Sequence, residues 1–234
     1  MLRLYPVRND QRLLLGLDEA GRGSVFGPLV VGGFAIRGSP EGTQAILRGV
    51  GARDSKTLSP TRRGEVYRRL QPLGTPAIAS AEPALIDTYV EQGKLNTLEV
   101  ELMASIVVRL QPDLVLADAC DPDARRFARQ LAARAEGSGW KGKVMAAHHA
   151  DRDHPLVGAA SVIAKVTRDR ALARIARRAG TNLGSGYPSD PTTREHLKGL
   201  LGRSPLPRYV RSSWATVRDL REELAHPPLE SFGT

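Results

Sequence analysis

The sequence is poor in cysteine and aromatic residues and has no long apolar run. Its 234 residues include one cysteine, Cys120, and Phe, Trp and Tyr together make up 5%. A single cysteine excludes an internal disulfide and fits a reducing cytosol. No apolar run approaches the roughly 18 residues that a membrane span needs, and residues 1–10 lack the apolar stretch of a signal peptide. We therefore expect a cytoplasmic protein that contacts no membrane.

Positive charge is concentrated in one part of the chain. The formal net charge is +9, and the segment from Ser161 to Arg221 contains 13 basic and four acidic residues, an excess of nine. The rest of the chain is therefore neutral in sum. A basic half indicates a polyanionic partner such as nucleic acid, although a generically basic solvated surface would give the same count.

Apolar periodicity and turn residues predict alternating strands and helices. Strands are predicted at 12–18, 28–36, 77–81, 113–118 and 143–147, and the first two are close enough along the chain to pair. Helices are predicted at 60–70, 96–110, 122–135, 156–178, 191–201 and 213–224. Ser59 is a good N-cap and Pro60 suits the first helical position. The pattern predicts an α/β fold in which a mixed sheet is flanked by helices, with a catalytic domain at 1–180 and a helical C-terminal extension at 181–234.

Several acidic residues lie at or just beyond the ends of predicted strands. Asp18 and Glu19 follow the first strand, Asp118 ends the DLVLAD strand, and Asp151 precedes the long helix that follows the 143–147 strand. Buried acids are costly unless they are paired or bound to metal. Carboxylates gathered at strand ends can hold two hard cations for phosphodiester hydrolysis. Acids at strand ends are also common in proteins without such a site, so the spacing leaves both interpretations open.

A histidine-rich segment offers a competing metal site. The stretch from His149 to His154 is similar to the HxHxDH zinc signature of metallo-β-lactamase-like hydrolases, but Asp151 stands where that signature has its second histidine. His196 and His226 are the histidines left downstream to complete such a site. An ordinary loop role for these histidines is the simpler interpretation, and Cys120 is likewise interpreted as a packing residue because no histidine pattern accompanies it.

An ordered set of motifs resembles ribonuclease HII, the type 2 ribonuclease H family. The segment GLDEAGRG at 16–23, followed by GPLV at 27–30, resembles the family signature. The other matching segments are DSK at 54–56, LNTLE at 95–99, the strand-end Asp118, AD at 150–151 with AASVIAKV at 159–166, GSGYPSDP at 184–191 and RSSW at 211–214. The last two look like the archaeal form. The ordered set covers nearly the whole chain and is far more specific than any one of its members.

The resemblance implies a ribonuclease H-like fold and an endonuclease. Such an enzyme would cut the RNA strand of RNA–DNA hybrids and single ribonucleotides in duplex DNA, leaving 3′-hydroxyl and 5′-phosphate ends. The carboxylates carried over are Asp18, Glu19, Asp118 and Asp151, with two Mg²⁺ or Mn²⁺ ions as cofactors. By this analogy Asp18 bridges both ions, Glu19 and Asp118 complete one ion site, and Asp151 completes the other.

The resemblance also implies residues that contact the substrate. These are Gly21, Arg22, Gly23, Lys56 and Tyr187. Glycines let the backbone approach a sugar closely, and only the 2′-hydroxyl marks a ribonucleotide within DNA. Arg22 and Lys56 suit phosphate contacts, and Tyr187 offers a flat ring and a hydroxyl to the neighbouring sugar.

The chain departs from the family at a few positions. Ser24 replaces a usual proline and is expected to loosen its turn, Gly158 replaces a commoner Ser or Ala, and Asp153 adds an acid beside Asp151. His154 stands where an aromatic residue is usual.

Two other functions are considered beside ribonuclease HII, and a protein partner is also expected. A non-catalytic nucleic-acid-binding protein would explain the basic half alone. A ribonuclease HIII-type enzyme would share the acids, but it usually carries an extra N-terminal domain, for which the position of Asp18 leaves no room. We expect a monomer, and Phe232 near the C-terminus suggests a short tail that could dock on a sliding clamp.

Overall fold

The computed structural model describes residues 12–225, which form two compact units. The first unit comprises 12–19, 31–79 and 99–166, and the second comprises 20–30, 80–98 and 167–225. Each unit is assembled from segments far apart in the sequence. The expected division of the chain after residue 180 stays a prediction. Within 12–225, no helix is long and apolar enough to cross a membrane.

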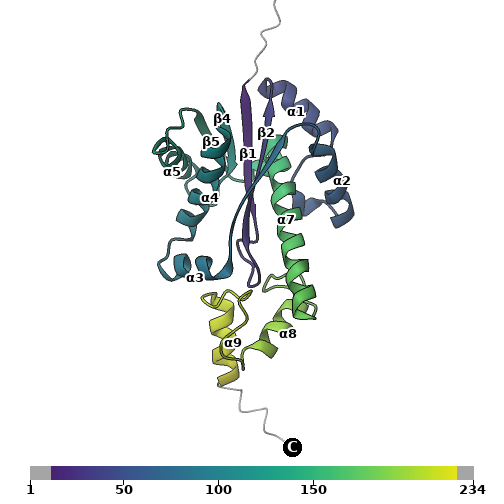
Figure 1. Ribbon diagram of the computed structural model, residues 1–234, viewed down its shortest axis with the longest axis vertical. Helices are drawn as coiled ribbons and strands as arrows, with labels where there is room; N and C mark the ends of the chain where they lie inside the picture. The colour runs from purple at the N-terminus through teal and green to yellow at the C-terminus, as the bar shows by residue number, and fades with distance from the viewer. Residues whose placement is uncertain (1–11, 226–234) are drawn as a thin grey trace, which may run out of the picture. The chain divides into compact units, whose positions relative to one another are not determined.

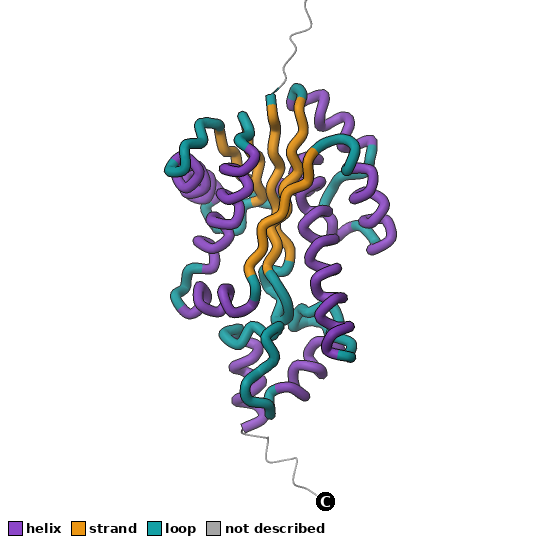
Figure 2. Tube along the Cα trace, viewed as in Figure 1, coloured by secondary structure: helices purple, strands orange, loops and turns teal. Residues whose placement is uncertain are grey.

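The first unit is built on a five-stranded sheet, drawn in orange in Figure 2. The strands are β1 (Leu13–Ala20), β2 (Leu29–Arg37), β3 (Thr75–Ala81), β4 (Leu114–Asp118) and β5 (Lys143–Ala147), in the order β3-β2-β1-β4-β5. β4 runs parallel to both β1 and β5. All five predicted strands and the adjacency of the first two are therefore confirmed. Parallel pairing of β1 with β4 puts the C-terminal ends of both strands at one edge of the sheet.

Helices cover both faces of this sheet because alternate residues of β1 point to opposite sides. Leu15 and Leu17 pack on one face with α4 (Leu95–Leu110) and α5 (Ala124–Glu136). Leu14 packs on the other face with α1 (Pro40–Gly49), α2 (Pro60–Leu70) and the first part of α7 (Pro155–Ala179). Figure 1 shows these two groups of helices on opposite sides of β1. The predicted sheet flanked by helices is confirmed.

Glycines permit unusually close packing of α7 on the sheet. A Cβ on Gly16 would lie 2.2 Å from the Leu156 carbonyl oxygen, and one on Gly32 would lie 2.5 Å from the Ala160 carbonyl oxygen. Real Cβ atoms do not approach backbone oxygen this closely, so both positions must lack a side chain. The contact brings the N-terminal half of α7 directly onto β1 and β2.

Capping residues account for several helix boundaries. The Ser59 side chain accepts a hydrogen bond from the Arg62 N–H, as expected for an N-cap followed by proline. The same arrangement, Ser39 followed by Pro40, begins α1, a helix that the sequence analysis did not predict. The predicted helix at 122–135 begins later, at Ala124, because Asp123 serves as its N-cap.

The second unit combines a loop from the first quarter of the chain with its C-terminal helices. Its helices include α3 (Pro83–Glu91), which was also not predicted, the later turns of α7, α8 (Pro191–Leu200) and α9 (Ala215–Ala225). Phe26 is fully buried, pairs with Val210 through an isolated β-bridge and meets the Tyr209 ring edge-on at 5.7 Å. The loop that follows β1 is therefore a core component of this unit.

Candidate active site

Two of the predicted acids lie close together at the C-terminal ends of neighbouring parallel strands. Asp118 is the last residue of β4, whereas Asp18 and Glu19, expected to follow the first strand, lie within the last three residues of β1. Leu17 of β1 is paired with Ala117 of β4, and each is followed directly by an aspartate, Asp18 and Asp118. The sheet register therefore brings these two acids to the same edge. Asp18 is buried, with 5% of its surface exposed.

The third aspartate reaches this edge through a tight connection after β5. β5 ends beside Asp118, and His149 then adopts a left-handed conformation (φ 57°) that leads into α6 (Ala150–Asp153). The Asp118 Oδ1 atom accepts a hydrogen bond of 2.8 Å from the Ala150 N–H. This bond fixes the start of α6, which carries the buried Asp151.

Burial and mutual repulsion raise the pKa values of two acids in this group. Burial, reinforced by the Asp118 and Asp151 charges, raises the pKa of Asp18 to about 8, although hydrogen bonds from Ser161 and from the Glu19 N–H oppose the shift. Burial, with the nearby Asp54 and Asp118, raises the pKa of Asp151 to about 6. The carboxylates are thus close enough to disfavour one another's charge.

A divalent cation matches the chemistry of this donor set. All the predicted donors are carboxylates, which suit hard cations such as Mg²⁺, and a positive ion would relieve the repulsion that raises their pKa values. Among residues 12–225, however, no three His, Cys, Asp or Glu side chains are arranged to hold a metal ion as they stand. The residues present fit such ions by the chemistry of their donor atoms alone. The same finding leaves the alternative zinc site around His149 without support in this part of the chain.

Lys56 is one of the cations close to these acids, and Arg152, whose Nε atom lies 3.4 Å from Asp54 Oδ2, is another. Lys56 lies on the short 3-10 helix η1 (Ser55–Thr57), is exposed, and has a raised pKa. Partial burial opposes its charge, but the carboxylates of Asp18, Asp151, Asp54 and Glu19 together outweigh that effect. An exposed ammonium held beside carboxylates can meet a phosphate that approaches them.

Asp54 is a buried acid of the site to which the sequence analysis gave no role. Its Oδ1 atom accepts a 2.8 Å hydrogen bond from the Lys56 N–H, and its charge is one of the causes of the raised pKa of Asp151. The DSK motif was the available signal, but only its lysine was assigned a contact. Gly158 lets this segment pack on α7, because a Cβ there would lie 2.6 Å from the Arg53 Cα.

The predicted substrate-contact residues after β1 are brought together within the second unit. Gly21 has a positive φ of 88°, and a Cβ there would lie 2.8 Å from the Pro28 carbonyl oxygen. Its N–H donates a 3.2 Å hydrogen bond to the Tyr187 hydroxyl, across 166 residues of sequence. Arg22 donates to the Asn96 side chain at 2.7 Å, and a Cβ on Gly23 would meet no atom within 4 Å. The turn is therefore rigid at Gly21 and open at Gly23.

A buried arginine holds the backbone of this turn. Arg211 is fully buried and donates to the carbonyl oxygens of Arg22 (2.9 Å) and Gly27 (3.0 Å). Its guanidinium lies over the Trp214 ring, 4.9 Å from the centroid. The RSSW motif thus has a local physical role, which is to fix the turn that follows β1.

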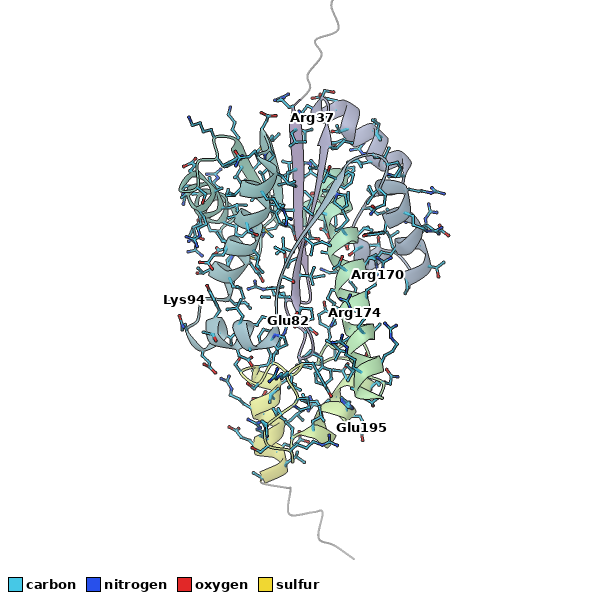
Figure 3. All side chains as sticks on the ribbon, viewed as in Figure 1. Arg37, Glu82, Lys94, Arg170, Arg174 and Glu195 are labelled. Atoms are coloured by element: carbon cyan, nitrogen blue, oxygen red, sulfur yellow. The ribbon has the colours of Figure 1, made fainter. Side chains whose placement is uncertain are left out.

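Exposed arginines extend along the second half of α7. Arg170 and Arg174, both labelled in Figure 3, are exposed one turn apart on this helix, and Arg177 and Arg178 follow on its last turn. Part of the predicted basic excess therefore lies on the surface of the second unit, where a polyanion could meet it.

Comparisons with known proteins agree with this architecture. The family model for ribonuclease HII matches residues 15–217. Ribonuclease HII of Methanoregula boonei is 36% identical over 224 residues, which cover 94% of this chain and 100% of the relative. The structure of the PCNA:RNase HII complex from Archaeoglobus fulgidus superposes with a TM-score of 0.80 at 36% identity, covering 94% of this chain and 100% of the matched chain. Ribonuclease H2 from Pyrococcus horikoshii OT3 gives a TM-score of 0.80 at 35% identity, covering 91% and 99%.

In each comparison the similarity extends over nearly the full length of both chains. They confirm the ribonuclease H-like α/β fold that the sequence motifs implied. The chain belongs to the ribonuclease HII family and is a ribonuclease H of type 2.

Proposed function

We propose that this enzyme is an endonuclease that hydrolyses the RNA strand of RNA–DNA hybrids and cuts at single ribonucleotides in duplex DNA, leaving 3′-hydroxyl and 5′-phosphate ends. Asp18, Glu19, Asp118 and Asp151 are its catalytic carboxylates and would hold two divalent ions, Mg²⁺ or Mn²⁺. The observation that carries the proposal is the convergence of Asp18 and Asp118 at the ends of paired parallel strands, with Asp18 buried and its pKa raised to about 8.

The bound ions would supply positive charge to the attacking and leaving oxygens of the phosphodiester. The chain's own residues would orient the substrate. Lys56 would contact a phosphate beside the carboxylates, and Arg22 would contact the phosphate next to the ribonucleotide. The backbone at Gly21 and Gly23 would approach the ribose closely enough to detect its 2′-hydroxyl.

Tyr187 would contact the sugar next to the ribonucleotide. Its hydroxyl accepts from the Gly21 N–H, so the tyrosine and the glycine turn form one local arrangement in the second unit. Contacts of this kind with the sugar would let the enzyme distinguish a ribonucleotide within DNA from a deoxyribonucleotide. The rival function, non-catalytic binding of nucleic acid by the basic half, accounts for the exposed arginines of α7 but gives no role to the buried carboxylates.

Cleavage of a labelled duplex with one ribonucleotide tests the proposal. We expect a single cut at the ribonucleotide with Mg²⁺ or Mn²⁺, no cut with EDTA, and no cut when the ribonucleotide is replaced by its deoxynucleotide. Mapping the ends gives the cut position and the end chemistry. Binding that weakens steeply with salt, without any cut in either metal, would instead support the non-catalytic alternative.

A sliding clamp is the proposed protein partner. The support is the Archaeoglobus fulgidus complex, in which a ribonuclease HII is bound to PCNA. Phe232, the residue that suggested a docking tail, lies outside the described residues. The monomeric state and the cytoplasmic location stay predictions.

A further inference from the structure

The side chain of Ser24 connects the turn after β1 to the loop that carries Tyr187. Ser24 is fully buried, and its hydroxyl lies 2.7 Å from the Gly186 carbonyl oxygen and 2.8 Å from the Phe26 carbonyl oxygen. Its N–H also donates to the Gly21 carbonyl oxygen at 3.2 Å. The serine was expected to loosen this turn, but its contacts instead hold the turn to a segment more than 160 residues away.

Arg168 completes the connection from α7. Its side chain is 1% exposed, its Nη2 atom donates to the Ser24 hydroxyl at 2.6 Å, and its Cζ atom lies 4.8 Å from the centroid of the Tyr187 ring. A buried guanidinium is costly unless it is well paired, and charge-assisted hydrogen bonds and aromatic stacking are the interactions that compensate it. The guanidinium also donates from Nη1 to the Asp169 Oδ1 atom at 3.3 Å, so Arg168 is held by Ser24, Tyr187 and Asp169 together.

Packing leaves this arrangement little freedom. Gly186 has a φ of 80°, and a Cβ at that position would lie 2.5 Å from the Arg168 Nη2 atom and 2.9 Å from the Ser24 hydroxyl. The backbone of the Tyr187 loop therefore rests directly on both side chains. Tyr187 is held on its ring face by Arg168 and at its hydroxyl by the Gly21 N–H.

We propose that Ser24 and Arg168 are positioning residues that fix the Tyr187 ring and hydroxyl against the Gly21 turn, and that they thereby set the enzyme's efficiency at single ribonucleotides in DNA. This inference rests on the proposed role of Tyr187 in contacting a sugar. Neither residue is assigned a contact with the substrate or the reacting atoms. Displacement of a substrate-orienting group by about 1 Å can cost up to about a hundredfold in rate, so loss of either support should lower activity through Tyr187.

A double-mutant cycle tests this route of action. Ser24→Ala and Arg168→Lys are each made in the wild-type chain and in Tyr187→Ala, and kcat/KM is measured on a duplex with one ribonucleotide. We expect each substitution to lower kcat/KM by about tenfold in the wild-type chain and by less than about twofold in Tyr187→Ala, because no ring then remains to be positioned. Ser105→Ala changes an exposed serine whose hydroxyl donates to the Leu102 carbonyl oxygen within α4; it serves as the control and should have little effect in either background.

The outcomes separate the inference from the function on which it rests. If each substitution lowers kcat/KM by the same factor with and without Tyr187, its effect is merely structural and the inference is overturned. If Arg168→Lys fails to fold, as judged by thermal unfolding, Ser24→Ala decides the test alone, since it removes one buried oxygen. If the wild-type protein does not cut the single-ribonucleotide duplex, the proposed function fails first.

Discussion

Replacing Asp18 by asparagine should abolish cleavage and, at the same time, stabilise the metal-free protein near neutral pH. The pKa of Asp18 is raised from 3.8 to about 8 by burial. Between pH 3.8 and about pH 8, Asp18 loses its proton in the unfolded chain but keeps it in the folded protein. The free energy of unfolding therefore falls as the pH rises through this range. The slope for one group is about 1.4 kcal/mol per pH unit. From pH 5 to pH 7, the wild-type protein should therefore lose about 2–3 kcal/mol of stability relative to Asp18→Asn.

Thermal unfolding in EDTA at pH 5 and pH 7 measures this difference. For a chain of this size, about 2–3 kcal/mol corresponds to a shift in Tm of roughly 5–10 °C. Asp219→Asn removes the same formal charge from an exposed position on α9 and serves as the matched control. Its Tm relative to wild type should change little between the two pH values.

Divalent ions supply the second half of the test. Mn²⁺ should raise the Tm of the wild-type protein, more at pH 7 than at pH 5, because ions bind the deprotonated carboxylates. The ion should have much less effect on Asp18→Asn, which keeps the shape of the side chain but loses its charge. A pH-independent difference between the two proteins would refute the reasoning on burial, and undiminished cleavage by Asp18→Asn in Mn²⁺ would refute the catalytic role.

Four further substitutions test the contacts and packing of the described residues. Tyr187→Ala should lower kcat/KM at single ribonucleotides by at least about tenfold, and an unchanged rate would exclude a sugar contact. Lys56→Ala should raise KM and reduce the salt dependence of KM by about one phosphate contact, as measured in a salt titration; an unaltered salt slope would remove Lys56 from the phosphate contacts. Gly32→Ala should destabilise the fold by about 1–3 kcal/mol because its Cβ would meet the Ala160 carbonyl oxygen at 2.5 Å. Gly64→Ala, which meets nothing within 4 Å in the middle of α2, should instead stabilise it by about 0.5–1 kcal/mol in urea unfolding.

The strands and most of the longer helices follow from local sequence signals. The apolar run before Asp18 and the LVLAD part of the DLVLAD segment both form strands, because each supplies buried side chains to the covered faces of the sheet. α1 begins with the same serine–proline pair as α2, so the sequence carries the same local signal for the start of both helices. α3 has no side-chain hydrogen bond at its N-cap, Glu82, and is short, which leaves a much weaker local signal.

The sequence motifs predict the acids of the candidate site, but they carry no information about the electrostatic interactions among them. Strand ends place Asp18 and Asp118 together once the strands are paired, and that pairing joins segments 100 residues apart. The raised pKa of Asp151 depends on Asp54, which lies nearly 100 residues earlier in the chain. Local patterns carry no information about such neighbours, so the role of Asp54 could emerge only from the folded arrangement.

Ser24 shows most clearly why the local rule was insufficient. Judged by its neighbours in sequence, a serine in place of proline adds backbone freedom to a turn. In the fold its hydroxyl and its N–H both find partners, and the N–H bond to Gly21 is one that proline could not make. The freedom gained in the unfolded chain is thus opposed by buried hydrogen bonds, each worth about 1 kcal/mol net and more where Arg168 contributes its charge. The same turn continues directly from the strand that carries Asp18 and Glu19, so the bonds that stiffen it should also limit the motion of the residues immediately after these proposed catalytic acids.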